Sequence, residues 1–321
     1  MTSNQQKQKQ NSFTVHRTVA MAIDPIHVGT GGSRLGRVDN SIVRDPVTRI
    51  PKIPGSSLAG VHRAYAAMAY EDERAGENSS FADKRSGGSK DTPFYPNCAG
   101  QGQAKDAGHC GDKACPICST FGHASFAGLA GFSDAHVLLF PVATREGPVW
   151  LTSPGAWRLI GQKVTATENV VHSEDQDGAL NLGWLLLPRK EWPNPKEPKD
   201  DALKQAGIPE HICNALALVS DKLFNHIVNS NLEVRTSVAI NPATGAAEDG
   251  ALFTYEALPR STVLVWDVTC RDPRHFDRSQ DLEIGVHQTV QKAEPLLAAL
   301  GVGGMGSRGM GRLRVLSAKE S

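Results

Sequence analysis

Short stretches in which apolar and polar residues alternate, or in which β-branched residues cluster, predict the β-strands of this chain. Residues 232–240 and 250–258 flank an Asn-Pro-Ala-Thr-Gly sequence at 241–245. These residue types favour a turn, so the two strands should form a hairpin. The other predicted strands cover residues 13–23, 135–142, 261–268 and 313–316, and residues 40–44 should be extended.

Apolar residues three or four positions apart predict a helix over residues 56–70, with an apolar face that runs from Leu58 to Met68. Ser56 or Ser57 is expected to cap this helix, because a serine hydroxyl accepts a hydrogen bond from a free amide of the first turn. Further helices are expected at 153–160, 210–217 and 221–228, and within 281–300.

The order of these elements predicts an α+β fold. Strands and helices do not alternate regularly, which does not fit a doubly wound parallel sheet. Long insertions separate them: residues 71–97 are polar, and 188–201 are proline-rich and charged. With 321 residues, the chain is long enough for about two domains, or for one core with large insertions.

The composition argues against two classes of protein, those that span a membrane and those that disulfide bonds stabilise. The chain is 40% hydrophobic and 21% charged, and no apolar run approaches the ~18 residues that a membrane helix needs. The polar first ten residues lack the apolar core of a secretion signal. Six cysteines are too few for a disulfide scaffold of this length. We therefore expect a cytoplasmic protein with no membrane partner.

The formal net charge of zero conceals an uneven distribution. Residues 1–63 contain nine Lys and Arg against three Asp and Glu, and residues 301–321 contain four against one, so these segments carry +6 and +3. Residues 64–300 contain 21 against 30 and carry −9. If the two basic ends meet in the folded protein, they form an anion-binding face; otherwise the asymmetry is incidental.

Four of the six cysteines lie in one short segment: Cys98, Cys110, Cys115 and Cys118. Four thiolates suit a closed tetrahedral zinc site, and the Cys-Pro-Ile-Cys sequence is typical of a zinc knuckle. His109 is an alternative ligand and His123 a weaker one. A redox Cys-x-x-Cys is the competing interpretation, but that motif requires a helix that begins directly after a strand. We therefore expect structural Zn²⁺.

A second motif lies at residues 301–312, where six glycines alternate with other residues that include Arg308 and Arg312. Glycines let main-chain amides approach a phosphate closely, and arginines add positive charge. The segment lacks the Gly-Lys-Ser/Thr ending of a P-loop, and it precedes a strand, whereas a dinucleotide fingerprint follows one. We therefore favour a phosphate-binding loop over a flexible surface loop.

Three separate segments together resemble one protein family. They are His-Val-Gly-Thr-Gly at 27–31, Val-Asp-Asn-Ser-Ile-Val-Arg-Asp at 38–45 leading into Ile-Pro-Gly-Ser-Ser-Leu at 53–58, and Gly-Ser-Arg-Gly-Met-Gly-Arg at 306–312. This combination resembles the RAMP superfamily of CRISPR effector proteins. Within it, the chain is similar to the backbone subunit of type III complexes, over roughly residues 13–316.

The middle of the chain is more similar to the Cmr (type III-B) branch than to the Csm (type III-A) branch. The similar segments are Gly-Phe-Ser-Asp-Ala at 131–135, Leu-Leu-Phe-Pro-Val at 138–142, Val-Arg-Thr-Ser-Val-Ala-Ile-Asn-Pro-Ala-Thr-Gly at 234–245, and Gly-Ala-Leu-Phe at 250–253 before Leu258-Pro259. The last glycine loop is more similar to the Csm branch.

The resemblance implies a ferredoxin-like (RRM-like) palm core with large insertions. The hairpin at 232–259 would be a thumb that wedges into the guide–target duplex and flips a base out at regular intervals. The implied division is a disordered tail at 1–12, palm segments at 13–70, 125–187 and 260–316, an insertion with the zinc knuckle at 71–124, a helical insertion at 188–231, and a tail at 317–321.

The resemblance also implies an endoribonuclease subunit that polymerises along the guide crRNA and cleaves complementary target RNA at regular intervals. Asp39 matches the aspartate that the family requires for cleavage, where a carboxylate can hold Mg²⁺ or assist proton transfer, and cleavage is expected to depend on Mg²⁺ or a similar divalent ion. His27 matches a helper histidine; a loop histidine bonded to the main chain is the alternative.

The implied partners are crRNA, target RNA, further copies of the chain and other type III effector subunits. The expected RNA contacts are Arg34, Arg37, Arg44, Lys52, Ser56, Ser57, Arg63, Arg235, Gly304, Gly306, Ser307, Arg308 and Arg312.

The chain departs from the family pattern in two places. Ala59 stands where the family's Gly-Ser-Ser-Leu-Lys-Gly has lysine, and Lys52 or Arg63 is expected to compensate. The Cmr branch carries a Glu and a Tyr before the Leu-Pro of the thumb, whereas residues 254–257 are Thr-Tyr-Glu-Ala. Two other functions stay open: a non-catalytic scaffold subunit of the same complex, and a zinc-stabilised nucleic-acid-binding protein outside any CRISPR system.

Overall fold

The structure is a computed structural model that describes residues 12–31, 38–75, 94–100, 108–110, 112, 114–173, 177–192, 199–276 and 285–317. Two of the expected RNA contacts, Arg34 and Arg37, lie outside these ranges. The chain forms two compact units. The smaller comprises Met1–His16, Ala59–Phe132 and Asp267–Ala293, and the larger comprises Arg17–Leu58, Ser133–Trp266 and Glu294–Ser321. These units cut across the palm and insertion segments expected from the sequence.

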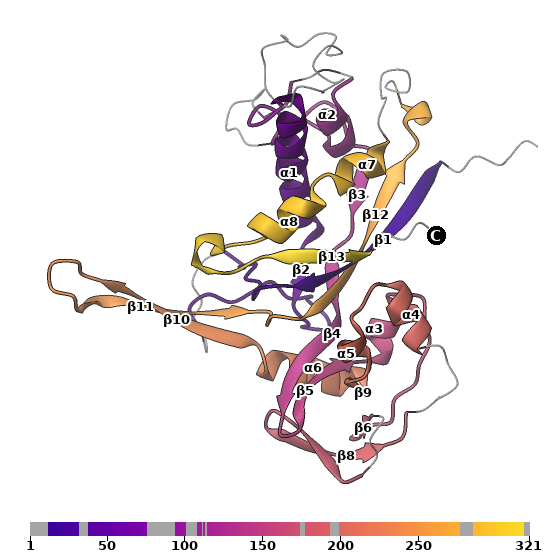
Figure 1. Ribbon diagram of the computed structural model, residues 1–321, viewed down its shortest axis with the longest axis vertical. Helices are drawn as coiled ribbons and strands as arrows, with labels where there is room; N and C mark the ends of the chain where they lie inside the picture. Colours follow the sequence, from indigo (N-terminus) through magenta and orange to yellow (C-terminus); the bar gives the residue numbers. More distant parts are fainter. Residues whose placement is uncertain are drawn as a thin grey trace, which may run out of the picture. The chain divides into compact units, whose positions relative to one another are not determined.

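A mixed sheet forms the centre of the larger unit and confirms the α+β class (Figure 1). Its strand order is β13 (Leu313–Ser317), β1 (Phe13–Ala22), β12 (Val263–Arg271), β4 (Ala135–Thr144), β5 (Gly147–Thr152), β9 (Leu216–Leu218), β6 (Val171–His172), β8 (Leu185–Lys190) and β7 (Ala179–Leu182). These strands pair antiparallel, as β1 with β13 and β4 with β5, and parallel, as β5 with β9 and β6 with β8. A short strand, β2 (Lys52–Ile53), pairs with β4 outside this order.

Five helices of the larger unit are α3 (Pro154–Arg158), α4 (Lys199–Gln205), α5 (Glu210–Cys213), α6 (Asp221–Ser230) and α8 (Glu294–Leu300). Ser153 and Ser220 cap α3 and α6, because their hydroxyls accept hydrogen bonds from amides of the first turn. A buried cluster that includes Leu139, Trp157 and Val263 forms part of the core.

The predicted helix at 210–217 is wrong in its second half. Helix α5 ends at Cys213, and Leu216–Leu218 forms strand β9, which pairs parallel with β5 and is buried throughout. A short apolar run fits a buried strand as well as a helix, so the neighbouring strand decided the outcome. The predicted helix within 281–300 is two helices, α7 (Val286–Gln291) and α8, because Pro295 has no amide hydrogen to continue α7.

A separate two-stranded sheet projects from the larger unit as a long arm (Figure 1). Strands β10 (Glu233–Ile240) and β11 (Ala247–Ala257) pair antiparallel and confirm the predicted hairpin. Thr236 lies opposite Thr254 in this pairing, and Val238 lies opposite Leu252. The side chains of Val238 and Leu252 are exposed, at 42% and 65%.

The smaller unit packs around helix α1 (Gly55–Ala75), of which residues 59–75 belong to it. Its buried cluster includes Tyr70, Phe94 and Ile117, together with three of the clustered cysteines. The Tyr70 and Thr289 hydroxyls are hydrogen-bonded at 3.1 Å, which joins α1 to α7. The unit also contains α2 (Pro116–Phe121), β3 (Ala130–Phe132), which pairs with the end of β12, and a 3₁₀ turn, η1 (Pro273–His275). In the described part of the chain, no helix is long and apolar enough to cross a membrane.

The expected serine cap of α1 is wrong. The helix begins at Gly55, ahead of both serines, and the Gly55 amide donates to Oδ1 of Asp134 at 2.8 Å. Oδ2 of Asp134 accepts a hydrogen bond from Nζ of Lys52 at 2.6 Å. An acid from a distant part of the sequence therefore stabilises the positive end of the helix, which leaves Ser56 exposed and Ser57 half-buried.

Candidate functional site

Asp39 lies at the base of the β10–β11 hairpin, where residues 39–42 run alongside β11. The amide of Asn40 donates to the carbonyl of Thr254 at 3.0 Å, and the amide of Glu256 donates to the carbonyl of Asn40, also at 3.0 Å. The bridge between Asn40 and Tyr255 is parallel. The segment that carries Asp39 is therefore held at the edge of β11 by main-chain hydrogen bonds.

The carboxylate of Asp39 is exposed but held in place by Thr254. Its Oδ2 accepts hydrogen bonds from the Thr254 amide at 2.7 Å and from the Thr254 hydroxyl at 2.9 Å. These two donors, the amide first, lower the pKa of Asp39 below its usual value of 3.8. The group is therefore ionised at neutral pH and has its other oxygen, Oδ1, for a ligand.

His27 is buried between β11 and the glycine loop, with 6% of its surface exposed. Its Nδ1 lies 2.6 Å from the carbonyl oxygen of Glu256, and its own carbonyl accepts a hydrogen bond from Gly304 at 2.8 Å. The ring meets Tyr255 edge-on at 5.9 Å. These contacts make His27 a link between the loop and the hairpin, as the main-chain-bonded alternative describes. Its catalytic role stays a prediction.

The glycine loop at 301–312 is anchored against β11. Met310 is buried with Tyr255 and Ala257. Gly303 has a φ of +85°, and a Cβ there would lie 2.4 Å from the carbonyl oxygen of His27, so this position requires glycine. The exposed part of the loop contains the expected contacts Gly304, Gly306, Ser307 and Arg308, the last three in a 3₁₀ turn, η2 (Gly306–Arg308).

Arg308 and Asp39 lie against neighbouring residues of β11. The guanidinium of Arg308 lies 5.6 Å from the ring centre of Phe253, which permits a cation–π contact. Successive side chains of a strand point to opposite faces. The Phe253 face therefore meets the glycine loop, whereas the Thr254 face meets Asp39.

Arg44 was expected to contact RNA, and the structure gives its guanidinium an internal role. Nη2 of Arg44 forms an ion pair with Oε2 of Glu256 at 2.7 Å, and the two side chains are only 16% and 12% exposed. Nε donates to Asn229 at 2.9 Å. Removing either charge from such a pair leaves the other one poorly solvated, so Arg44 fastens its segment to β11 and α6.

Arg63, another of the expected RNA contacts, also forms internal hydrogen bonds. Its guanidinium donates to the main-chain carbonyls of Cys98 at 2.7 Å, Gly108 at 2.8 Å and Gly122 at 2.6 Å. These three acceptors take the N–H of Nε and one N–H of each terminal nitrogen. Arg63 therefore ties the cysteine-containing loops to α1, and its contact with RNA stays a prediction.

The remaining cations differ in how strongly they are engaged. Lys52 pairs with Asp134, as described above, with its side chain 17% exposed. Arg312 pairs with Asp24 and Arg235 with Glu233, but their side chains are 48% and 37% exposed. Arg308 has no acidic partner among the residues that the structure describes.

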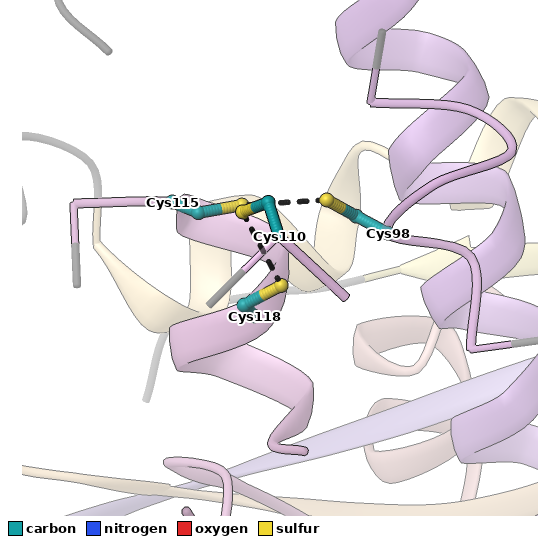
Figure 2. Close-up of side chains that lie close together, drawn as sticks. All are labelled: Cys98, Cys110, Cys115 and Cys118. Carbon is teal, nitrogen blue, oxygen red and sulfur yellow. Dashed lines mark hydrogen bonds between the residues drawn. The ribbon is translucent and has the colours of Figure 1, made fainter. Parts of the chain in front are cut away.

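The four predicted cysteine ligands come together in the smaller unit, where their side chains point toward one another (Figure 2). The four sulfurs all lie within 4.8 Å of one another. Cys110 and Cys118 are 3.8 Å apart and Cys115 and Cys98 are 3.9 Å apart, which is too far for disulfides. Hydrogen bonds with the other thiols, Cys110 first, and then burial raise the pKa of Cys115.

The sequence interpretation missed Thr254 as a functional residue. Its hydroxyl contacts Asp39 across 215 positions of the chain. The hairpin pattern predicts only that Thr254 lies opposite Thr236, and a threonine in a strand is common because its branched side chain suits the pleat. No sequence signal connected it to residue 39.

Comparisons with known proteins cover nearly the whole chain. The RAMP superfamily profile matches residues 20–314. The CRISPR system Cmr endoribonuclease Cmr4 of Pyrococcus furiosus is 25% identical over 280 residues, which are 81% of this chain and 82% of that protein. The CRISPR system Cms endoribonuclease Csm3 of Streptococcus thermophilus is 35% identical over 74 residues, which are 22% of this chain and 34% of that protein.

Solved structures show the same fold. A chain of the type III-B Cmr-beta complex bound to cognate target RNA has a TM-score of 0.62 and 16% identity, covering 95% of this chain and 99% of that one. The crystal structure of oligomeric Cmr4 from Pyrococcus furiosus has a TM-score of 0.57 and 18% identity, covering 96% and 100%. The profile match over residues 20–314 covers most of the larger unit, the cysteine cluster and the β10–β11 hairpin. The chain therefore belongs to the RAMP superfamily.

Proposed function

We propose that this protein is a guide-RNA-binding backbone subunit of a type III CRISPR effector, which polymerises along crRNA and cleaves complementary target RNA at regular intervals with Asp39. The observation that carries the proposal is an exposed, ionised carboxylate held at the base of a projecting hairpin, opposite an anchored glycine loop. The relatives named as endoribonucleases support RNA cleavage as the reaction class.

One face of β11 contacts the guide strand, and the other face contacts the target strand. On the Phe253 face, Arg308 and the amides of the glycine loop hold guide phosphates. On the Thr254 face, the exposed Val238 and Leu252 lie farther out along the hairpin than Asp39 and offer an apolar surface to an unstacked target base. Together with a ferredoxin-like palm, this arrangement fits a thumb that separates a base from the duplex.

Asp39 acts on a 2′-hydroxyl of the target strand. When a flipped nucleotide places this hydroxyl in line with the neighbouring phosphorus, a bond from the 2′-oxygen to phosphorus forms as the bond to the 5′-oxygen breaks. The proton of the 2′-hydroxyl passes to water and water protonates the departing 5′-oxygen, so the products are a 2′,3′-cyclic phosphate and a 5′-hydroxyl. Oδ1 of Asp39 accepts a hydrogen bond from the attacking hydroxyl and orients it. Because the hydrogen bonds from Thr254 lower the pKa of Asp39, it orients this hydroxyl more effectively than it removes its proton.

A Mg²⁺ site built by this chain alone does not fit the residues around Asp39. Among the described residues, the cysteines form the only group of three or more potential metal-binding side chains. Asp39 provides one carboxylate, and the nearby carboxylate of Glu256 is paired with Arg44. Mg²⁺ takes six oxygen ligands, several of them usually from water or substrate phosphate, and one carboxylate of this chain does not define such a site, so we derive no step of the reaction through a metal.

The cysteine cluster fits structural Zn²⁺. A tetrahedral ion with Zn–S distances of about 2.3 Å separates its sulfurs by about 3.8 Å. Two of the sulfur pairs lie 3.8 and 3.9 Å apart, close to that value. Cys98, Cys110, Cys115 and Cys118 would hold the ion, which supplies a crosslink between loops and no reaction chemistry.

Cleavage of a guide-complementary, end-labelled RNA by the assembled complex tests the proposal. Wild-type protein should yield a ladder of regularly spaced products, and Asp39→Ala should abolish it while guide and target binding stay unchanged. Asp45→Asn is the matched control: among the described residues, the Asp45 carboxylate accepts hydrogen bonds from Val47 and Thr48 of its own turn, and asparagine keeps the accepting oxygen.

The result also decides between cleavage and the scaffold alternative. Tight guide-dependent binding without a ladder from wild-type protein would identify a subunit that holds target RNA and does not cut it. Equal loss of binding and cleavage in Asp39→Ala would make Asp39 a structural residue.

A further inference from the structure

The contact between Asp39 and Thr254 runs in both directions. Besides the two hydrogen bonds that Oδ2 of Asp39 accepts, the amide of Asp39 donates to the Thr254 hydroxyl at 3.1 Å. The hydroxyl therefore accepts from the main chain of Asp39 and donates to its side chain. This closed pair of bonds fixes the carboxylate relative to its own backbone as well as to β11.

The carboxylate would otherwise be poorly held. Asp39 is an exposed residue, and an exposed side chain keeps several rotamers unless its partners select one. Of the two partner atoms, the Thr254 amide is fixed by β11, but only the hydroxyl also binds the Asp39 amide. The hydroxyl thus links the rotamer of the carboxylate to the position of the hairpin.

We propose that Thr254 is a positioning residue for cleavage: its hydroxyl holds Oδ2 of Asp39 and so aims Oδ1 at the 2′-hydroxyl of the target strand. This inference rests on the proposed function of Asp39. It makes the hairpin part of the cleavage site, because a displacement of β11 displaces the carboxylate with it. A misplacement of about 1 Å at a reacting group lowers a rate on the order of a hundredfold.

The chain contains a matched control directly opposite Thr254. Thr236 has the same side chain, lies on the same face of the hairpin and is paired with Thr254 across the two strands. Its side chain is exposed, and no hydrogen bond joins it to Asp39 in the described part of the chain. Valine at either position keeps the branched shape that a strand favours and removes only the hydroxyl.

The experiment compares single-turnover target cleavage by complexes assembled with wild type, Thr254→Val, Thr254→Ser, Thr236→Val and Asp39→Ala. We expect Thr254→Val to slow cleavage by about tenfold or more, Thr254→Ser to restore at least half of the wild-type rate, and Thr236→Val to stay within about twofold of wild type. Guide and target affinity and the melting temperature should be the same for both valine variants.

A pH–rate profile adds a result that a purely structural role would not produce. The hydrogen bond from the Thr254 hydroxyl lowers the pKa of Asp39, after the larger effect of the Thr254 amide. Removing the hydroxyl therefore raises that pKa toward 3.8. The acid limb of the Thr254→Val profile should therefore lie at higher pH than that of wild type.

The outcomes separate the two proposals. A wild-type rate for Thr254→Val, beside an inactive Asp39→Ala, overturns the positioning role and leaves the proposed function intact. Equal slowing by Thr236→Val and Thr254→Val also overturns it, because the hydroxyl contact with Asp39 would then not matter. If wild-type protein itself does not cleave, the proposed function fails, and the positioning role fails with it.

Discussion

Arginine residues in this chain show how far a side chain's role depends on its partners. Arg44, Arg63 and Arg308 have the same side chain, yet Arg44 is paired with a half-buried glutamate and Arg63 with three carbonyls. Arg308 instead lies exposed on the glycine loop against Phe253. The first two stabilise the fold, which leaves Arg308 as the cation best placed for a phosphate.

Substituting Arg308 tests this distinction. A cation that binds a phosphate releases a counterion, so the logarithm of affinity falls with the logarithm of salt concentration by about 0.7 per contact on a single strand. Arg308→Ala should weaken guide binding and reduce the salt slope by about that amount. Arg158→Ala is the control, since Arg158 is exposed and pairs with Asp221. An unchanged slope in Arg308→Ala would exclude the glycine loop as a phosphate contact.

At the scale of elements, the cysteine cluster brings a short helix and two loops together. The loops that carry Cys98 and Cys110 adjoin helix α2, which has only six residues and contains Cys118. Arg63 binds the carbonyl of Cys98, so the cluster and α1 are joined through one guanidinium. A metal ion held by these thiolates would bind only the folded arrangement, so its binding free energy would add to the stability of the short helix and the two loops.

Cys115→Ser tests the metal site. We expect zinc to fall from one ion per chain toward zero and the melting temperature to drop by several degrees, as measured by elemental analysis and by thermal unfolding. Cys213→Ser removes a buried thiol outside the cluster and should retain zinc. A normal zinc content in Cys115→Ser would contradict the assignment of this ligand.

At the scale of the whole molecule, the two basic ends of the sequence do meet. Strands β1 and β13 pair, and the loop that contains His27 bonds to the glycine loop at Gly304. Two of the positive charges in these segments are nevertheless paired with acids of residues 64–300, Arg44 with Glu256 and Lys52 with Asp134. The net charge of a segment therefore overstates the charge that it offers to an anion.

The stability of the whole chain should depend on the protonation of Glu294, the first residue of α8. Burial raises the pKa of this half-buried carboxyl from 4.5 to about 7. Between these values the folded state holds a proton that the unfolded state has lost, so stability falls as pH rises and levels off above about 7.

Glu294→Gln removes this ionisation and should therefore raise the melting temperature more at pH 8 than at pH 5. The difference in stabilisation should be about 1–2 kcal/mol, measured by thermal unfolding at both pH values. Glu210→Gln, at the exposed first residue of α5, should change the melting temperature equally at both. An equal effect of Glu294→Gln at pH 5 and pH 8 would contradict the burial of its charge.

The local elements followed from the sequence where the pattern was long and regular. Strands β1, β4 and β12, helix α6 and the β10–β11 hairpin lie close to their predicted residues, because alternation and turn residues act over a few positions. Short or ambiguous runs failed: β9 was expected to continue a helix, and the strands from β5 to β8 were not predicted. Strand β9 pairs with β5, whose residues lie far away in the sequence, whereas β5 and β7 pair with their sequence neighbours β4 and β8 in hairpins that the pattern did not reveal.

The sequence by itself determined the α+β class, the cysteine ligands and the motifs that contain Asp39 and the glycine loop, since each is carried by residues close together in the chain. Only the tertiary structure decided which groups face each other. It brought Thr254 into contact with Asp39, 215 positions away, and Glu256 into contact with Arg44, 212 positions away. It also brought Asp134 to the first amide of α1, 79 positions away. A hydrogen bond depends on distances of about 3 Å between atoms, and separation along the chain does not specify those distances until the chain has folded.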